Sequence, residues 1–171
     1  MIAGETRDPR GGLRARRLVL LPLRLVVGFG FAAHGYAKLA RGPESFAAIL
    51  GAMGIPAPGP VAWMTSVLEL LGGASLMLGA YVTPLSVPLG IVMATAMFGV
   101  HLRYGFSSVR LQAMNATGAV FGPVGYELNL LYMAALLTLA LGGISPLSID
   151  GWREARAASP RERDHHVKTG D

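Results

Sequence analysis

Four long apolar segments, separated by loops or turns, dominate the pattern of hydrophobic and polar positions along this chain. They cover residues 18–40, 61–82, 85–102 and 126–149. Each approaches the length of about 20 predominantly apolar residues that a helix needs to cross a bilayer. Thr83 and Pro84 form an uncharged turn between the second and third segments, which predicts a helical hairpin there. The pattern therefore predicts an all-α polytopic membrane protein, a bundle of four transmembrane helices embedded in the lipid bilayer.

The segments outside these helices divide the chain into three parts. Residues 1–17 form a basic tail, residues 18–152 form the membrane domain, and residues 153–171 form a polar tail that we expect to be disordered. Within the membrane domain, residues 44–53 are amphipathic and predict a short helix at the membrane interface. Residues 103–125 are expected to be a loop between the third and fourth helices.

Composition and charge agree with a membrane protein. The chain is 52% hydrophobic and only 15% charged, whereas soluble domains are about a quarter charged. The formal net charge is +5, but no basic stripe with interleaved aromatic residues indicates a nucleic-acid partner. The basic residues gather in the two tails: Arg7, Arg10, Arg14, Arg16, Arg17, Arg153, Arg156, Arg161, Arg163 and Lys168. Because lysine and arginine accumulate on the cytoplasmic side of membrane proteins, both termini are predicted to be cytoplasmic.

The absence of cysteine limits the chemistry that the chain can perform by itself. Cys is missing from the whole sequence, so the chain can form no disulfide and can hold no iron–sulfur cluster through its own thiolates. Any redox role therefore needs a bound cofactor or a partner protein.

Glu69 is the most informative residue, because it lies inside the apolar segment 61–82. A carboxylate at the centre of a membrane helix costs roughly 2.5–3.5 kcal/mol on insertion scales. A sequence that keeps one there supplies a partner for it or uses it. Two interpretations stay open: a neutral acid that is hydrogen-bonded between helices, and a proton acceptor or head-group ligand at a functional site.

The predicted topology brings further polar residues to the outer half of the membrane, near Glu69. With a rise of 1.5 Å per residue, each of the four helices contributes to this level. The sequence predicts an outward-opening polar pocket, in which Glu69 is protonated or paired with His34, and Lys38 pairs with Glu127 at the rim. The candidate pocket residues are Glu69, His34, Lys38, His101, Glu127 and Asn129. They lack a recognised metal-ligand spacing, so no metal is expected, and no catalytic residue is identified.

A second pair of charges is predicted at the cytoplasmic end of the bundle. Arg24 lies near the start of the first helix and Asp150 at the end of the fourth. A guanidinium can reach along its helix toward a carboxylate at the interface. We expect Arg24 and Asp150 to form a structural ion pair that joins the two helices.

The order of these residues resembles the DoxX family of small bacterial membrane proteins. The resemblance extends over about residues 18–152. It rests on motifs in the first, second and fourth helices: Arg24-Leu-Val-Val-Gly28, His34-Gly35-Tyr36-Ala37-Lys38-Leu39, Glu69-Leu-Leu-Gly72-Gly73, Leu78-Gly79, Tyr126-Glu127-Leu-Asn129-Leu-Leu and Ser148-Ile-Asp150.

This resemblance implies a four-helix bundle in the bacterial cytoplasmic (inner) membrane. The family is named after a subunit linked to thiosulfate:quinone oxidoreduction, and its relatives are associated with oxidative-stress complexes. It therefore implies a membrane subunit or anchor of a quinone-linked oxidoreductase or oxidative-stress complex, with quinone as a candidate cofactor and soluble redox proteins as candidate partners. A transporter or permeability protein for a small polar or amphipathic solute, and a non-catalytic assembly scaffold, remain alternatives. Whether the chain is itself an enzyme, and whether it forms a homo-oligomer, stay open.

Overall fold

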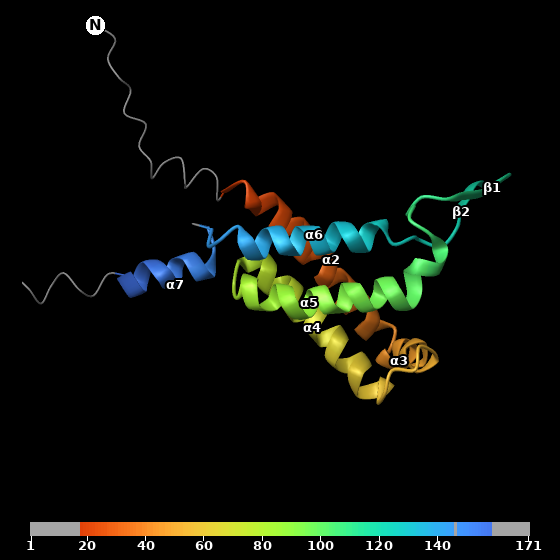
Figure 1. The fold of residues 1–171 in the computed structure, drawn as a ribbon, viewed down its shortest axis with the longest axis horizontal. Coiled ribbons are helices and arrows are strands. Elements are labelled where there is room, and N and C mark those ends of the chain that lie inside the picture. Colours follow the sequence, from red (N-terminus) through yellow and green to blue (C-terminus); the bar gives the residue numbers. More distant parts are fainter. Residues whose placement is uncertain (1–17, 146, 159–171) are drawn as a thin grey trace, which may run out of the picture.

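The computed structural model describes residues 18–145 and 147–158, and this part of the chain is mainly helical. Figure 1 shows the long helices beside one another, with a β-hairpin near one end and α7 at the other. The helices are α2 (Leu20–Ala40), α3 (Pro43–Ala52), α4 (Pro58–Leu78), α5 (Val82–Ala96), α6 (Glu127–Leu141) and α7 (Ile149–Ala158). After α5 the helix continues through a π-helical turn (Met97–His101) and a 3₁₀ turn (Leu102–Tyr104).

Three helical segments in the described part of the chain are long and apolar enough to cross a membrane. They are Leu20–Ala40, Pro58–Leu78 and the continuous stretch Val82–Tyr104. The fourth apolar helix, α6, has 15 residues and is about 22 Å long at 1.5 Å per residue, shorter than a hydrocarbon core of about 30 Å. The structure therefore supports a helical membrane protein with three candidate spans.

The position predicted for the end of the fourth helix is wrong. We expected the helix to run to residue 149, but α6 ends at Leu141 and a new helix, α7, begins at Ile149. Gly142 and Gly143 follow α6 directly, and Gly143 has a left-handed φ of +76°, which glycine adopts without a Cβ clash. Hydropathy alone did not distinguish this apolar turn from an apolar helix. Part of the tail that we expected to be disordered is helical, because α7 extends to Ala158; residues 1–17 and 159–171 lie outside the described residues.

The loop predicted at residues 103–125 contains an antiparallel hairpin that the sequence analysis missed. Strand β1 (Leu111–Asn115) pairs with β2 (Gly118–Phe121). Asn115 Oδ1 accepts hydrogen bonds from the Thr117 amide at 3.0 Å and from the Thr117 hydroxyl at 2.7 Å. Asn side chains that bond to the backbone two residues on are turn formers, and Gly118 follows with a positive φ of +123°. Asn115 and Gly118 were therefore turn signals in the sequence.

The turn of the predicted helical hairpin is displaced by a few residues. Helix α4 ends with Gly79 in the left-handed conformation, at φ +68°, and α5 begins at Val82. Thr83 and Pro84, which we expected to form the turn, therefore lie in the first turn of α5. A proline is tolerated there because the first helical amides have no partner within the helix.

Helices α2 and α4 approach each other closely, through glycine and alanine. A Cβ atom on Gly73 would clash with the backbone nitrogen of Ala32 and would lie 2.5 Å from the carbonyl oxygen of Gly28. Small residues four apart, as Gly28 and Ala32 are, let the backbones of two membrane helices come together. Gly28 and Ala32 permit such an approach between α2 and α4.

An apolar core joins α2 and α4 to α5 and α6. The aromatic rings of Phe31 on α2 and Tyr132 on α6 meet edge to face, with centroids 5.4 Å apart. The buried core residues are Val27, Phe31, Leu76, Leu89, Ala135, Leu136 and Leu139.

The Gly73→Ala variant should lose stability, because its added methyl group meets backbone atoms of α2 that cannot rotate away. Overpacking of this kind typically costs about 1–3 kcal/mol. Gly90→Ala on α5 is the matched control, since a Cβ there meets nothing within 4 Å and alanine favours a helix over glycine by about 1 kcal/mol. Thermal unfolding in detergent should separate the two variants; equal melting temperatures would contradict the close α2–α4 packing.

Candidate functional site

The intramembrane acid is paired with a lysine from the neighbouring helix. Lys38 Nζ lies 2.6 Å from Glu69 Oε2. The Glu69 side chain is 2% exposed and that of Lys38 is 23% exposed, so the carboxylate lies inside the protein and the ammonium lies closer to the surface. Lys38 is therefore the partner of Glu69. The sequence analysis had expected Glu69 to be protonated or paired with His34, and Lys38 to pair with Glu127.

The backbone of α2 and α4 explains why this pair can form. One turn before Lys38, a Cβ atom on Gly35 would lie 2.6 Å from the carbonyl oxygen of Ser66. Ser66 in turn precedes Glu69 by one helical turn, and its buried hydroxyl donates to the Ala62 carbonyl at 2.7 Å. The two helices are therefore in near contact one turn away from the charged residues, and the lysine side chain reaches the carboxylate across this contact.

An aromatic ring from α3 completes the surroundings of the lysine. Lys38 Nζ lies 4.2 Å from the centroid of the Phe46 ring. A cation over an aromatic face is attracted to the ring by about 0.5–1 kcal/mol at exposed sites and by more where water is excluded. The short helix that we expected at residues 44–53 is present as α3. Through Phe46 it contributes to the site.

The other predicted pocket residues make no hydrogen bond or ion pair with Glu69 among the described residues. Asn129 is buried and its Nδ2 donates to the Met93 carbonyl at 3.3 Å. The remaining contacts lie in the segment between α5 and α6: His101 Nδ1 is 2.9 Å from the Val124 carbonyl oxygen, and Glu127 Oε2 accepts a hydrogen bond from the Ser108 amide at 3.0 Å.

The pairing predicted at the rim of the pocket is not formed. Glu127 stabilises the loop before α6 instead of pairing with Lys38 at a rim. His34 is exposed on α2, and no hydrogen bond or ion pair of this residue occurs within the described part of the chain. Among residues 18–145 and 147–158, no three His, Asp or Glu side chains gather in a metal-binding arrangement. The core of the candidate site is thus Lys38, Glu69 and Phe46, and the sequence analysis missed Phe46.

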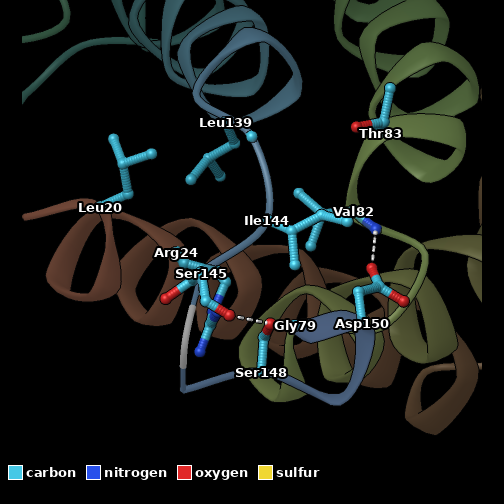
Figure 2. Close-up of a pocket in the computed structure, with 11 residues that line it drawn as sticks. Leu20, Arg24, Gly79, Val82, Thr83, Leu139, Ile144, Ser145, Ser148 and Asp150 are labelled. Atoms are coloured by element: carbon cyan, nitrogen blue, oxygen red, sulfur yellow. Dashed lines mark hydrogen bonds between the residues drawn. The ribbon is translucent and has the colours of Figure 1, made fainter. Parts of the chain in front are cut away.

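At the opposite end of α2, Arg24 and Asp150 line one small cavity (Figure 2). They are not joined by a direct ion pair in the described structure. Arg24 Nη2 donates to the Leu147 carbonyl at 2.7 Å, while Asp150 Oδ2 accepts a hydrogen bond from the Val82 amide at 3.3 Å. The backbone amide of Asp150 also donates to the Gly79 carbonyl at 3.1 Å.

Asp150 thus holds the turn between α4 and α5. Its side chain caps the first amide of α5, and its backbone amide satisfies a carbonyl at the end of α4. Helix termini leave such groups without partners, and a carboxylate at a helix N-terminus is also favoured by the helix dipole. The sequence analysis placed Arg24 and Asp150 at the same end of the bundle, but it did not anticipate that backbone groups would be their partners.

Comparison with known proteins identifies the family. The DoxX family model matches residues 19–102, which include α2, α3, α4 and α5 and therefore both residues of the Lys38–Glu69 pair. The chain belongs to the DoxX family. An uncharacterized protein of Haemophilus influenzae is 30% identical over 130 residues, which cover 75% of this chain and 85% of that protein. No solved structure matches the chain.

The Lys38→Met variant should be clearly less stable than the native protein, because it leaves the buried Glu69 carboxylate without its cation. Breaking a buried pair from one side can cost about 3–5 kcal/mol. The double variant Lys38→Met/Glu69→Gln should recover much of this loss, since no charge is left uncompensated. Denaturant unfolding in detergent would measure the free energy of unfolding of both variants. A double variant as unstable as Lys38→Met alone would show that the two charges are not coupled.

Proposed function

We propose that this DoxX protein is a multi-pass membrane subunit or anchor of a quinone-linked oxidoreductase, and that the Lys38–Glu69 pair binds the quinone head group. The observation that carries the proposal is a charged pair held between apolar helices, with the acid buried and the lysine half-buried. Charged residues inside membrane segments commonly mark ligand or proton pathways. An amphipathic ligand with a polar head and an apolar tail suits a charged pair between apolar helices, in which the lysine side chain is 23% exposed.

The chemistry of the two side chains suits a quinone carbonyl. The lysine ammonium carries three N–H donors. One ion pair with Glu69 Oε2 uses only part of this capacity, so the ammonium can also donate to a quinone oxygen. Glu69 is an acid–base group next to that ammonium and can hold or release a proton. When bound, a quinone supplies two-electron redox chemistry coupled to two protons. Because the chain has no cysteine, we propose that a soluble redox protein is the electron-transfer partner.

The membrane topology forms part of the same proposal. We propose that α6 is the fourth span and that both termini are cytoplasmic, in the bacterial inner membrane. A short helix can be accommodated by local thinning of the bilayer, and α6 is apolar with acid only at its first position. In this orientation Lys38 lies about 21 Å along α2 from Arg24, at 1.5 Å per residue, and so in the outer half of the membrane. The quinone head group would bind at that level.

Reporter fusions test the topology. A fusion of alkaline phosphatase to Asp171 should be inactive and a fusion of green fluorescent protein at the same position should fluoresce, because the basic tails favour the cytoplasm. A phosphatase fusion within residues 111–121, in the loop before α6, should be active and serves as the opposite control. Strong phosphatase activity at Asp171 would place the C-terminus outside the cytoplasm and would contradict the proposed topology of four spans with both termini in the cytoplasm.

Titration with a short-chain quinone analogue tests the binding site. In the full chain reconstituted in nanodiscs, Glu69→Gln should weaken binding by about tenfold or more, since hydrogen bonds to charged groups contribute about 1.5–3 kcal/mol. Glu44→Gln makes the same change at an exposed acid on α3 and should leave the affinity unchanged. If Glu69→Gln folds with a native melting temperature and binds the analogue as tightly as the native protein, the quinone site is not at Glu69.

A further inference from the structure

Two residues that line the cavity at the proposed cytoplasmic end of the bundle carry a buried polar atom without a protein partner. The two atoms are Nε of Arg24 and Oγ of Ser145, neither of which has a hydrogen-bond partner among the described residues. Arg24 is 5% exposed and Ser145 is 6% exposed. Both residues line a cavity of about 30 Å³, together with Asp150. Buried polar atoms are nearly always hydrogen-bonded, so we expect a ligand in the cavity to be the hydrogen-bond partner of these two atoms.

We infer that this cavity is an internal hydration site, in which an ordered water molecule links Arg24 to Ser145 and Asp150. The size of the cavity favours water over larger ligands. A buried water needs roughly 10–15 Å³ of such volume, whereas pockets for organic ligands measure roughly 300–1,000 Å³. The cavity is thus a site distinct from the proposed quinone site, which lies near the other end of α2.

The hydrogen-bonding groups around the cavity match the chemistry of water. Arg24 Nε–H can only donate, a serine hydroxyl can donate and accept, and an ionised carboxylate can only accept. A ligand that serves all three must both accept and donate, as water does. The opposite charges of Arg24 and Asp150 compensate each other, so the site also favours a neutral ligand over an anion or a cation.

The backbone prevents the two charged side chains from meeting directly, which leaves room for the water. Nη2 of Arg24 is held by the Leu147 carbonyl, and Nη1 lies against Gly79, where an added Cβ would be only 2.6 Å away. Asp150 is held from the other side by the amide of Val82. Figure 2 shows Arg24 and Asp150 on different sides of the cavity, with Ser145 beside Arg24. Polar groups beyond direct contact are commonly bridged by a water.

The water would connect three parts of the fold that are distant in sequence. Arg24 belongs to α2, Ser145 to the segment after α6, and Asp150 to the first turn of α7. The attachment of α7 to the helices then depends on one solvent molecule as well as on the hydrogen bonds of Leu147 and Asp150. A wet cavity and a dry cavity therefore predict opposite responses to mutation.

Two substitutions distinguish a wet cavity from a dry one by the sign of their effect on the melting temperature. In a wet cavity, Ser145→Ala removes the hydrogen bond between the serine hydroxyl and the water. Val82→Ile displaces the water that accepts a hydrogen bond from Arg24 Nε–H. Each variant should then melt about 2–4 °C lower, the shift expected for a small loss in a chain of this size. In a dry cavity Ser145→Ala removes an unpaired buried hydroxyl and Val82→Ile fills empty space, so both should melt higher. Ser86→Ala, at a similarly buried serine that bonds to the Val82 carbonyl of its own helix, is the control and should change little.

Nuclear magnetic resonance on the full chain in nanodiscs decides the question directly. With arginine labelled at ¹⁵Nε, the native protein should show a dipolar cross-peak between the Arg24 Nε–H proton and a long-lived water. The peak is assigned by its absence from Arg24→Lys, and it should be lost or weakened at least threefold in Val82→Ile. A native protein without this cross-peak, or a Ser145→Ala variant that melts higher than the native protein, would overturn the hydration site. Neither measurement involves quinone, so the result is independent of the proposed function.

Discussion

A carboxylate buried between membrane helices needs a cation within reach, and the close contact of α2 and α4 supplies one. Gly28, Ala32 and Gly35 bring the α2 backbone against α4, which places Lys38 beside Glu69. A larger side chain anywhere along this contact would separate the helices and leave the acid without its partner. The small residues and the charged residues of α2 therefore act together: the former permit the contact, and the latter need it.

The sequence predicted the existence of the main elements better than their ends. The apolar segments and the acid at Glu69 are visible in hydropathy, because both depend on the composition of a single segment. The break after Leu141 and the true position of the turn before α5 depend on left-handed glycines, Gly143 and Gly79. Hydropathy is insensitive to such backbone conformations, and both errors arose at these positions.

The candidate pocket was predicted only in part, for a similar reason. Topology and helical rise place residues at a depth in the membrane, but they do not determine which faces meet. Lys38 and Glu69 lie on the most extensively packed helix pair, whereas Asn129 lies between α5 and α6 and His34 faces outward. Residues that were predicted at one level therefore bond to different helices. Phe46 escaped notice because its role depends on the way α3 folds back over Lys38.

The two ends of α2 satisfy their charges in different ways, and the difference follows from the local backbone. Glu69 lies inside α4, where the backbone amides are bonded within the helix, so a side chain has to neutralise the acid. Near Arg24 the ends of α4 and α6 and the starts of α5 and α7 meet, and helix termini offer carbonyl and amide groups. Arg24 and Asp150 use these groups as partners and stay apart. A direct charge pair with a half-exposed lysine can exchange its partner for a ligand, whereas charges fixed by backbone groups are suited to holding helices together. The physical distinction between the ends thus favours a ligand at Lys38–Glu69 and a structural role for Arg24 and Asp150.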